Sequence, residues 1–215
     1  YDTWDSITAR TEPMAGRPAR DARDTAMMIY TSGSTGQPKG VMHCFENITR
    51  ASEGITADIK SRIGDLPENR ILSYLPLAHV FERAWVECAS MVDGKTHVFF
   101  AETLDTFLAD LNRARPTTFI SVPRLWLKFQ QGVFTKMPPK KLDRLLGIPI
   151  LGRIVGRKVL KGLGLDQALL AGSGSAPIPA DLIAWYRRLG LNLIEGYAMT
   201  EDFAYSHNST EAINE

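Results

Sequence analysis

The sequence predicts an α/β fold in which largely parallel sheets are covered by helices. Short apolar runs rich in β-branched residues alternate with stretches that have the apolar spacing of helices, and this alternation continues along most of the chain. Strands buried on both faces give continuous apolar runs, as these are, and that favours parallel pairing. Composition agrees, because 215 residues with 44% hydrophobic and 23% charged side chains can bury a sizeable core.

The two ends of the chain differ from its centre. Residues 1–25 mix arginines, acidic residues and prolines without any apolar period, so we expect a surface segment that leads into the fold. The apolar run at residues 27–30 ends at a Gly/Ser/Thr cluster, which indicates a strand entering a tight loop, and a helix is expected from about His43. Residues 202–215 are polar and acidic and are expected to be a tail that does not pack.

Residues 26–201 are expected to form the core. Leu104, Phe107, Leu108 and Leu111 recur at the spacing of a helix packed on a sheet, and Pro116 ends that helix. The other expected elements are strands at residues 71–75, 96–100, 117–122, 169–171 and 192–197, with helices at residues 84–92 and 179–189.

Charge and cysteine content exclude several classes of protein. The net charge of +1 gives no reason to expect nucleic acid or an acidic partner. The spacing of Cys44 and Cys88 suits neither a metal site nor a redox pair, so we expect buried, reduced thiols in a cytoplasmic protein. No stretch approaches the roughly 20 apolar residues that cross a bilayer, and no basic segment followed by an apolar one opens the sequence.

The chemistry is concentrated in residues 30–40, YTSGSTGQPKG, directly after the first expected strand. Glycines let backbone N–H groups approach phosphate oxygens, hydroxyls donate hydrogen bonds, and Lys39 supplies a positive charge. The loop is not a Walker loop, because two residues separate Gly36 from Lys39 and no hydroxyl follows the lysine. Ser34 also lacks the spacing of a hydrolase nucleophile. A flexible linker is the alternative, but the embedded Pro-Lys-Gly and the apolar flanks disfavour it.

The run YTSGSTGQPKG resembles the signature loop of the adenylate-forming, or AMP-binding, superfamily, which includes acyl-CoA synthetases, luciferases and nonribosomal peptide adenylation domains. LPLAHVFER at residues 75–83 resembles the second core motif of that family. GYAMTE at residues 196–201 resembles its G-Y-G-x-T-E motif, with Ala198 where many members have glycine. GSGSAP at residues 172–177 resembles the loop whose backbone lines the adenine pocket.

The resemblance implies ATP-dependent activation of a carboxylic acid through an acyl-adenylate to acyl-CoA, with ATP, Mg²⁺ and CoA as cofactors. Both reactants of the first step are anions, so catalysis rests on positioning and charge neutralisation and needs no protein nucleophile. By resemblance, Tyr197 stacks near the adenine, Thr200 contacts the α-phosphate, and Glu201 helps to hold Mg²⁺. The implied catalytic residues are Lys39, His79, Thr200 and Glu201, and the implied metal ligands are Thr35 and Glu201. The implied nucleotide-binding residues are Thr31, Ser32, Gly33, Ser34, Thr35, Gly36, Lys39, Gly174, Ser175, Ala176, Pro177, Glu195, Gly196, Tyr197, Ala198, Met199 and Thr200.

Plainer interpretations stay open for three of these residues. Lys39 fits a solvated charge, His79 a satisfied core histidine, and Glu201 an acid at a helix start. Two different functions also stay open for the chain: an aryl or amino-acid adenylating domain, and a noncatalytic nucleotide-binding module.

Two further stretches bear on the substrate. PTTFISVPR at residues 116–124, like PLAHVFER, resembles long-chain fatty-acyl-CoA synthetases, so a long-chain fatty acid is the expected acid. Residues 136–161 set many lysines and arginines against the single acid Asp143, with aliphatic residues between them. Such a run fits either a peripheral contact with the inner face of the membrane or a solvated helical face beside the acyl tunnel.

Members of the family are longer than this chain. The later Tyr-x-Thr-Gly-Asp motif, the hinge and the lid lysine of the family are not found among these residues. We therefore expect part of the large N-terminal domain without the C-terminal lid, with weak nucleotide binding and little turnover by itself. The sequence gives no indication of oligomeric state.

Overall fold

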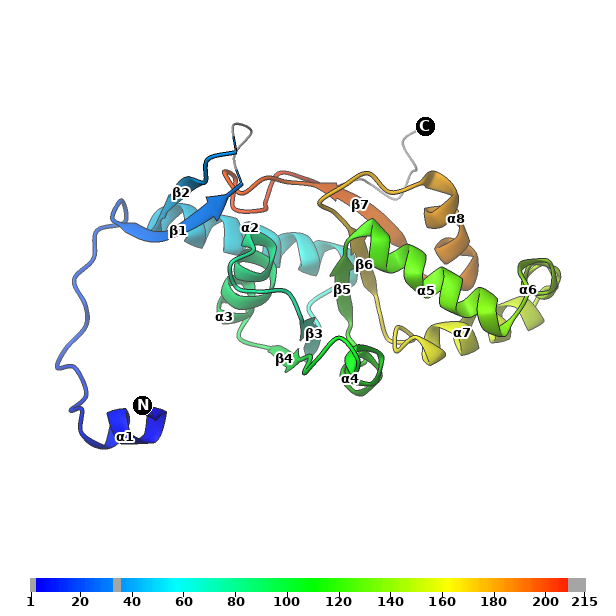
Figure 1. The fold of residues 1–215 in the computed structure, drawn as a ribbon, viewed down its shortest axis with the longest axis horizontal. Helices are drawn as coiled ribbons and strands as arrows, with labels where there is room; N and C mark the ends of the chain where they lie inside the picture. Colours follow the sequence, from blue (N-terminus) through cyan, green and yellow to red (C-terminus); the bar gives the residue numbers. More distant parts are fainter. Residues whose placement is uncertain (1–2, 33–35, 209–215) are drawn as a thin grey trace.

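A computed structural model describes residues 3–32 and 36–208 and confirms the α/β class (Figure 1). Most strand pairs are parallel, as the buried apolar runs predicted. One parallel pair consists of β3 (Asn69–Ser73) and β4 (Thr96–Phe100). A second sheet has the order β5 (Thr118–Ser121), β6 (Leu170–Ser173), β7 (Leu193–Tyr197) and β8 (His207–Asn208), in which only β8 is antiparallel to its neighbour.

The two sheets meet where β3 lies beside β5. The backbone N–H of Thr117 donates to the carbonyl of Arg70 at 2.9 Å. The hydroxyl of Tyr74 lies 3.2 Å from the carbonyl oxygen of Ile120 and 2.9 Å from Oγ of Ser121. Because these bonds join the ends of the two strands, the carboxyl ends of the parallel strands lie along one edge of the molecule.

The first apolar run belongs to a hairpin. β1 (Thr25–Thr31) pairs antiparallel with β2 (Lys39–Cys44), and Gly40 lies opposite Tyr30. The helix expected from about His43 is confirmed as α2 (Phe45–Ile63), which begins two residues later, after a strand that was not expected. Residues in β2 alternate between exposed and buried sides, and His43 is buried while its neighbour Met42 is exposed, so the period is that of a strand.

The remaining helices cover the sheets. The helix expected at residues 84–92 begins earlier, as the π-helix η1 (Glu82–Cys88), and continues as α3 (Ala89–Asp93). Leu104 does not belong to its expected helix, because Thr103 and Thr106 exchange side-chain hydrogen bonds with each other's backbone N–H at 3.0 and 3.1 Å and the helix starts after them. The other helices are α4 (Phe107–Ala114), α5 (Pro123–Lys136), α6 (Pro139–Leu146), α7 (Leu151–Gly162) and α8 (Ala180–Leu189).

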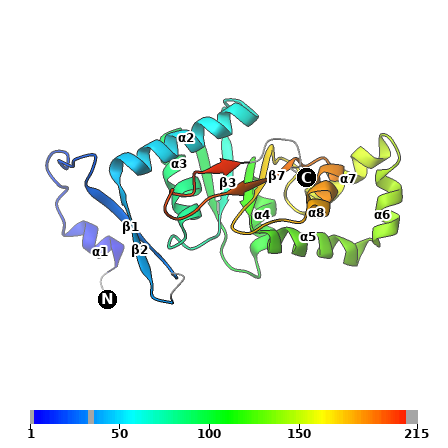
Figure 2. The ribbon, with the colours of Figure 1, turned by 90° about the horizontal axis from the view of Figure 1, so that it is seen from above.

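Two hydrophobic cores support this arrangement. The larger one gathers under α4, α5, α7 and α8 and includes the fully buried Trp126, Tyr186 and Phe119. The smaller one lies between the hairpin, α2 and η1 and includes Trp85 and Phe203. Figure 2 shows the hairpin and helices α5 to α8 at opposite ends of the molecule. The candidate site lies between the two cores.

The ends of the described chain differ in their packing. Residues 3–25 are exposed, and they include the short helix α1 (Trp4–Ala9), which lies away from the sheets in Figure 1. The expectation of a tail that does not pack from residue 202 onwards is wrong for its first part, because Phe203 and Ala204 are buried in the smaller core. Residues 209–215 lie outside the described residues.

The two thiols are free, as expected. Cys44 and Cys88 are half-buried, however, where full burial was expected. Burial raises the pKa of the Cys88 thiol. In the part of the chain that the structure describes, no helix combines the length and the hydrophobicity that spanning a membrane requires.

Candidate functional site

A cavity of about 310 Å³ opens at the carboxyl ends of β6 and β7. This is the edge at which parallel α/β sheets place their ligand sites, and the volume lies at the lower end of the roughly 300–1,000 Å³ typical of small-molecule sites. Three segments of the chain meet there: the loop after β6, the end of β7 with the turn that follows it, and the start of η1. Its lining includes the predicted site residues His79, Gly174, Ser175, Gly196, Tyr197, Ala198, Met199 and Thr200.

The loop after β6 is held in an unusual conformation. The backbone N–H of Gly174 donates to the carbonyl of Ser121 at 3.0 Å. Ser175 follows with φ of 67°, a left-handed conformation that costs a residue other than glycine about 1–3 kcal/mol. Beside it, Ser173 is 1% exposed and lines the cavity, yet its Oγ has no hydrogen-bond partner among the described residues. A buried hydroxyl without a partner is available to a ligand.

Residues further along this loop support it from outside the cavity. Oε1 of Glu195 accepts a hydrogen bond from the backbone N–H of Ile178 at 3.0 Å, and so ties the loop to β7. Ala176 and Pro177 are exposed on the way to Ile178. These three predicted residues, Glu195, Ala176 and Pro177, are therefore next to the cavity without forming its wall.

The turn after β7 carries Thr200 and is clamped at several points. Oδ1 of Asp202 accepts a hydrogen bond from the N–H of Met199 at 3.0 Å, and the N–H of Ala204 donates to the carbonyl of Met199 at 3.0 Å. Phe203 and Ala204 both have φ of 55°, which is again costly for these residue types. The indole Nε1 of Trp85 donates to the carbonyl of Ala204 at 2.8 Å, so η1 holds the turn in place.

His43 lies beneath this turn. Its ring is 2% exposed and meets Phe203 edge-on, with ring centroids 5.0 Å apart. Burial lowers the pKa of His43, against a raising influence from the backbone of Thr200 and from the nearby acidic charges. A neutral imidazole therefore supports the turn, while Glu201 is exposed on its outer side.

His79 faces the cavity from the segment just before η1. Its Nδ1 accepts a hydrogen bond from the backbone N–H of Phe81 at 3.2 Å, so the neutral ring carries its proton on Nε2 and can donate there. The interpretation as a core histidine is wrong, because His79 is exposed. Behind it, the fully buried carboxyl of Glu82 accepts a hydrogen bond from Oγ of Ser73, and burial raises its pKa.

The signature stretch begins in β1 and ends in β2 of the hairpin. Gly33, Ser34 and Thr35 lie outside the described residues. Thr31 pairs with Lys39 across the hairpin, and the side chain of Lys39 is exposed. The implied residues Thr31, Ser32, Gly36 and Lys39 do not line the cavity.

Of the two implied magnesium ligands, the structure describes Glu201. Glu201 is exposed beside the cavity, and Thr35 lies outside the described residues. Within residues 3–32 and 36–208, no three His, Cys, Asp or Glu side chains gather in a way that could hold a metal ion. Mg²⁺ in nucleotide sites is commonly held by one or two carboxylates together with phosphate oxygens, so a single carboxylate such as Glu201 fits that chemistry.

Several residues of the cavity wall were not predicted. They include Trp85, Tyr205, Ser206 and His207. The segment after Thr200 turns back so that His207 pairs with Tyr197 across β7 and β8. The aromatic pair Phe203 and Tyr205 within an otherwise polar stretch is the sequence signal that could have indicated this packing.

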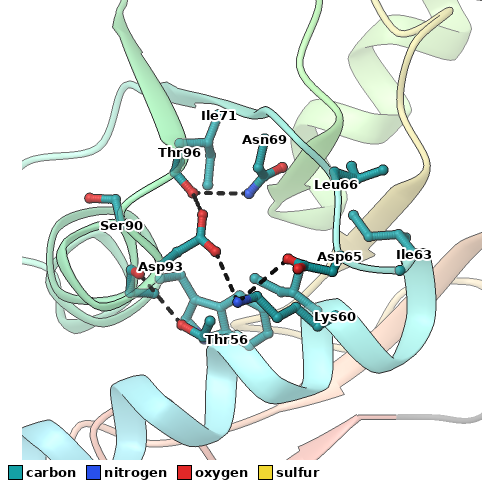
Figure 3. A pocket seen from close by; sticks show the side chains of 14 residues that line it. Thr56, Lys60, Ile63, Asp65, Leu66, Asn69, Ile71, Ser90, Asp93 and Thr96 are labelled. Carbon is teal, nitrogen blue, oxygen red and sulfur yellow. Dashed lines mark hydrogen bonds and ion pairs between the residues drawn. The ribbon is translucent and has the colours of Figure 1, made fainter.

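A second, smaller cavity lies between α2, α3 and the sheet of β3 and β4 (Figure 3). Its polar side chains stabilise the fold by binding one another. Nζ of Lys60 lies 3.5 Å from Oδ1 of Asp93 and 3.7 Å from Oδ1 of Asp65. Oγ1 of Thr96 donates to Asp93 at 2.7 Å and accepts from the amide of Asn69 at 3.2 Å. With a volume of about 20 Å³ it has room for roughly one water molecule, so its polar groups bind one another.

Comparison with known proteins identifies the family of the chain. The sequence matches the family described as AMP-binding enzyme over residues 3–213. Long chain acyl-CoA synthetase 5 of Arabidopsis thaliana is 30% identical over 210 residues, which are 87% of this chain and 31% of that protein. A carboxylic acid reductase of Segniliparus rugosus is 34% identical over 209 residues, which are 93% of this chain and 17% of that protein.

A solved structure supports the same relationship. The A domain of the Segniliparus rugosus reductase, in complex with AMP and a co-purified carboxylic acid, matches with a TM-score of 0.73 at 30% identity, covering 93% of this chain and 32% of that one. The chain thus spans about a third or less of the length of these relatives. Because the family match extends over nearly all of its residues, this chain belongs to the AMP-binding enzyme family.

Proposed function

We propose that this chain carries the nucleotide-binding part of a site that activates a carboxylic acid as its acyl-adenylate. The observation that carries the proposal is the convergence of the loop after β6, the clamped turn with Thr200, and the donor His79 on one cavity. Long-chain acyl-CoA synthetases among the relatives, together with the resemblance of PTTFISVPR and PLAHVFER, favour a long-chain fatty acid as substrate and CoA as the final acceptor.

The lining of the cavity suits a nucleotide. Glycines at positions 172, 174 and 196 leave its backbone accessible, and the hydroxyl of Ser173 is free to bind a polar group. Tyr197 is 61% exposed, so its ring is open to stacking with a base. AMP bound to the related reductase domain supports the same class of ligand here.

The reaction would then rest on charge neutralisation. Negative charge builds up around the α-phosphate as the acid attacks it and pyrophosphate leaves. The hydroxyl of Thr200 and Nε2–H of His79 are two donors beside the cavity that would oppose this charge. Mg²⁺, when bound, neutralises phosphate charge, and Glu201 with Thr35 would hold it.

The acyl group of the adenylate could pass to CoA or be reduced. The reductase relative is as similar to this chain as the synthetases are, which favours a second candidate: adenylation of an acid whose acyl group is then reduced. Both candidates need the same acyl-adenylate cavity. An aryl or amino-acid adenylating domain would use this cavity too, whereas a noncatalytic module would bind the nucleotide there without turnover.

Calorimetric titration of the chain tests the proposal. The ligands are AMP, Mg·ATP, and nonhydrolysable adenylate mimics that carry either a palmitoyl or a benzoyl group. We expect the palmitoyl mimic to bind more tightly than AMP. Tyr197→Ala should weaken both by roughly 5- to 150-fold, since stacking of one base on an aromatic ring contributes about 1–3 kcal/mol. A double variant, Lys39→Ala with Glu201→Ala, should weaken Mg·ATP more than AMP.

The matched control is Phe100→Ala, which removes another exposed aromatic ring, outside the cavity. Equal losses in Tyr197→Ala and Phe100→Ala, or no binding by a chain that circular dichroism shows to be folded, would contradict the proposal. Tighter binding of the benzoyl mimic would keep the adenylate site and replace the fatty acid with an aromatic acid.

A further inference from the structure

The helices at the end of the molecule opposite the hairpin expose aliphatic side chains. The loop between α6 and α7 and the first turns of α7 carry Ile148, Ile150, Leu151 and Ile154, which are 44%, 74%, 38% and 60% exposed. They border a groove of about 1080 Å³ that runs between α7, α8 and the start of β6. Several large aliphatic residues exposed together on one face mark a surface that contacts something apolar.

This face is held rigidly. The buried side of α7 consists of Gly152, Gly156 and Leu160, spaced so that all three lie on one side of the helix. A Cβ at Gly152 would lie 2.5 Å from the carbonyl oxygen of Leu146, and one at Gly156 would lie 2.5 Å from that of Leu189. Because glycine lets α7 pack closely on α6 and α8, the aliphatic residues on its outer side keep fixed positions.

Ile150 is placed outward by its backbone. It has φ of 68° and ψ of −59°, a conformation that is an outlier for a β-branched residue. Glycine or asparagine would be expected at such a position if the loop had only to turn. A large apolar side chain occupies it and is 74% exposed.

Basic side chains surround the same face. Among the described residues, the lysines and arginines of residues 136–161 form no ion pairs. The single acid of this run, Asp143, is neutralised by Arg188 of α8, at 2.8 Å between Nη1 and Oδ1. Arg153 and Arg157 line the groove itself. The charge that remains is therefore positive.

We propose that this face, formed by Ile148, Ile150, Leu151 and Ile154 with Arg153 and Arg157, docks on the surface of a bilayer that contains anionic phospholipid. The charge complements anionic headgroups, and the aliphatic side chains reach the acyl boundary beneath them. A second copy of the chain would bring like charges together. Nucleic acid would need exposed aromatic rings for stacking, and residues 136–161 contain no aromatic residue.

The docking face and the nucleotide cavity share no lining residue, although both reach β6. Leu169, before the strand, lines the groove, whereas Ser173, at its end, lines the cavity. Docking would therefore leave the cavity open to nucleotide. The proposal goes beyond the adenylation activity and does not depend on it, because lipid binding can be measured without ATP or acid.

Flotation of the chain with phospholipid vesicles tests the proposal. One set of vesicles contains phosphatidylcholine alone, and the other contains about a third phosphatidylserine. We expect partition onto the anionic vesicles only, weakened by salt. Arg153→Gln with Arg157→Gln should reduce it about 25-fold, since each basic side chain near such a surface contributes about fivefold. Arg17→Gln with Arg20→Gln, in the exposed lead-in, makes the same change of charge elsewhere and should leave partition unchanged.

Ile150→Gly separates docking from folding. Glycine accepts the positive φ without strain, so the variant should be at least as stable as the parent while losing roughly tenfold in partition. Binding to neutral vesicles as strong as to anionic ones, or equal losses in the groove variant and the lead-in control, would overturn the proposal. So would an absence of vesicle binding together with self-association that Ile150→Gly abolishes, which would assign the face to a second copy.

Discussion

The hydrogen bond from Trp85 to Ala204 offers a test of how the site is held together. Trp85 is 7% exposed and donates through Nε1 to the carbonyl of Ala204 at 2.8 Å. Trp85→Phe keeps an aromatic ring in the smaller core but removes the only donor of the side chain. The carbonyl of Ala204 would then be left buried without this partner, which costs about 1–3 kcal/mol.

Trp185→Phe is a closely matched control. Trp185 is 6% exposed, and its Nε1 has no hydrogen-bond partner among the described residues. Both variants lose the same atoms from a buried ring, so the packing terms are similar and the difference between them isolates the hydrogen bond. We expect Trp85→Phe to lower the free energy of unfolding by about 1–3 kcal/mol more than Trp185→Phe does.

The assay combines urea unfolding, followed by circular dichroism, with titration of AMP. The bond also holds a turn in which Phe203 and Ala204 have positive φ, so its loss should release the turn that carries Thr200. AMP affinity should fall in Trp85→Phe, by at most the roughly 5- to 150-fold that 1–3 kcal/mol represents, and should be unchanged in Trp185→Phe. An equal or larger loss of stability in Trp185→Phe would refute the reasoning.

Three further predictions concern stability. Gly164→Ala should destabilise the chain by more than about 2 kcal/mol, because φ is 75° and a Cβ would lie 2.7 Å from the backbone of Leu111. The control is Gly162→Ala, whose Cβ would have no atom within 4 Å; it should be neutral or stabilising in the same urea titration. Burial raises the pKa of Glu82, so this group stabilises the folded state below pH 4.5, its unfolded pKa, and the stabilisation is lost as pH rises through the folded pKa. Glu82→Gln should abolish this loss of stability. A variant whose unfolding keeps the same pH dependence would contradict the reasoning. Burial lowers the pKa of His43, so its effect on stability has the opposite pH dependence: the unfolded chain binds the proton first as pH falls below 6.5, and the folded state loses stability. His43→Leu should remove this loss of stability, which thermal unfolding from pH 5 to 8 measures.

Much of the fold could be predicted because its signals are local. The apolar runs of β4, β5 and β7 and the helical stretch of α8 are each continuous, and the structure confirms them with small shifts at their ends. β2 was missed because Lys39–Cys44 follows a loop signature and contains glycine and alternating residues, a pattern weaker than that of a buried strand. Its formation depends on pairing with β1, which no local pattern encodes.

In the candidate site too, local motifs predicted some residues, while others depend on contacts between distant segments. Motif spacing identified Gly174, Tyr197 and Thr200, and the cavity brings them together. The GSGSAP stretch placed Ser173 in the pocket loop but could not indicate that its buried hydroxyl lacks a partner. Spacing also could not identify Trp85, whose hydrogen bond to Ala204 spans 119 positions. Such contacts depend on tertiary packing between segments far apart in the chain, which residue types and spacing do not specify.

The two walls of the cavity pack on different hydrophobic cores, so they should differ in how easily they open locally. The loop after β6 is attached to the larger core, where Nε1 of Trp126 donates to the carbonyl of Gly172 at 3.1 Å. The turn with Thr200 is attached to the smaller core through Trp85 and Phe203. The smaller core has fewer buried side chains, and its turn holds two residues in costly left-handed conformations. Local opening occurs first where burial is least, so the turn should open at a lower free energy than the loop. A nucleotide that touches both walls would stabilise each wall against opening by the free energy of its binding, so the turn would remain the weaker of the two.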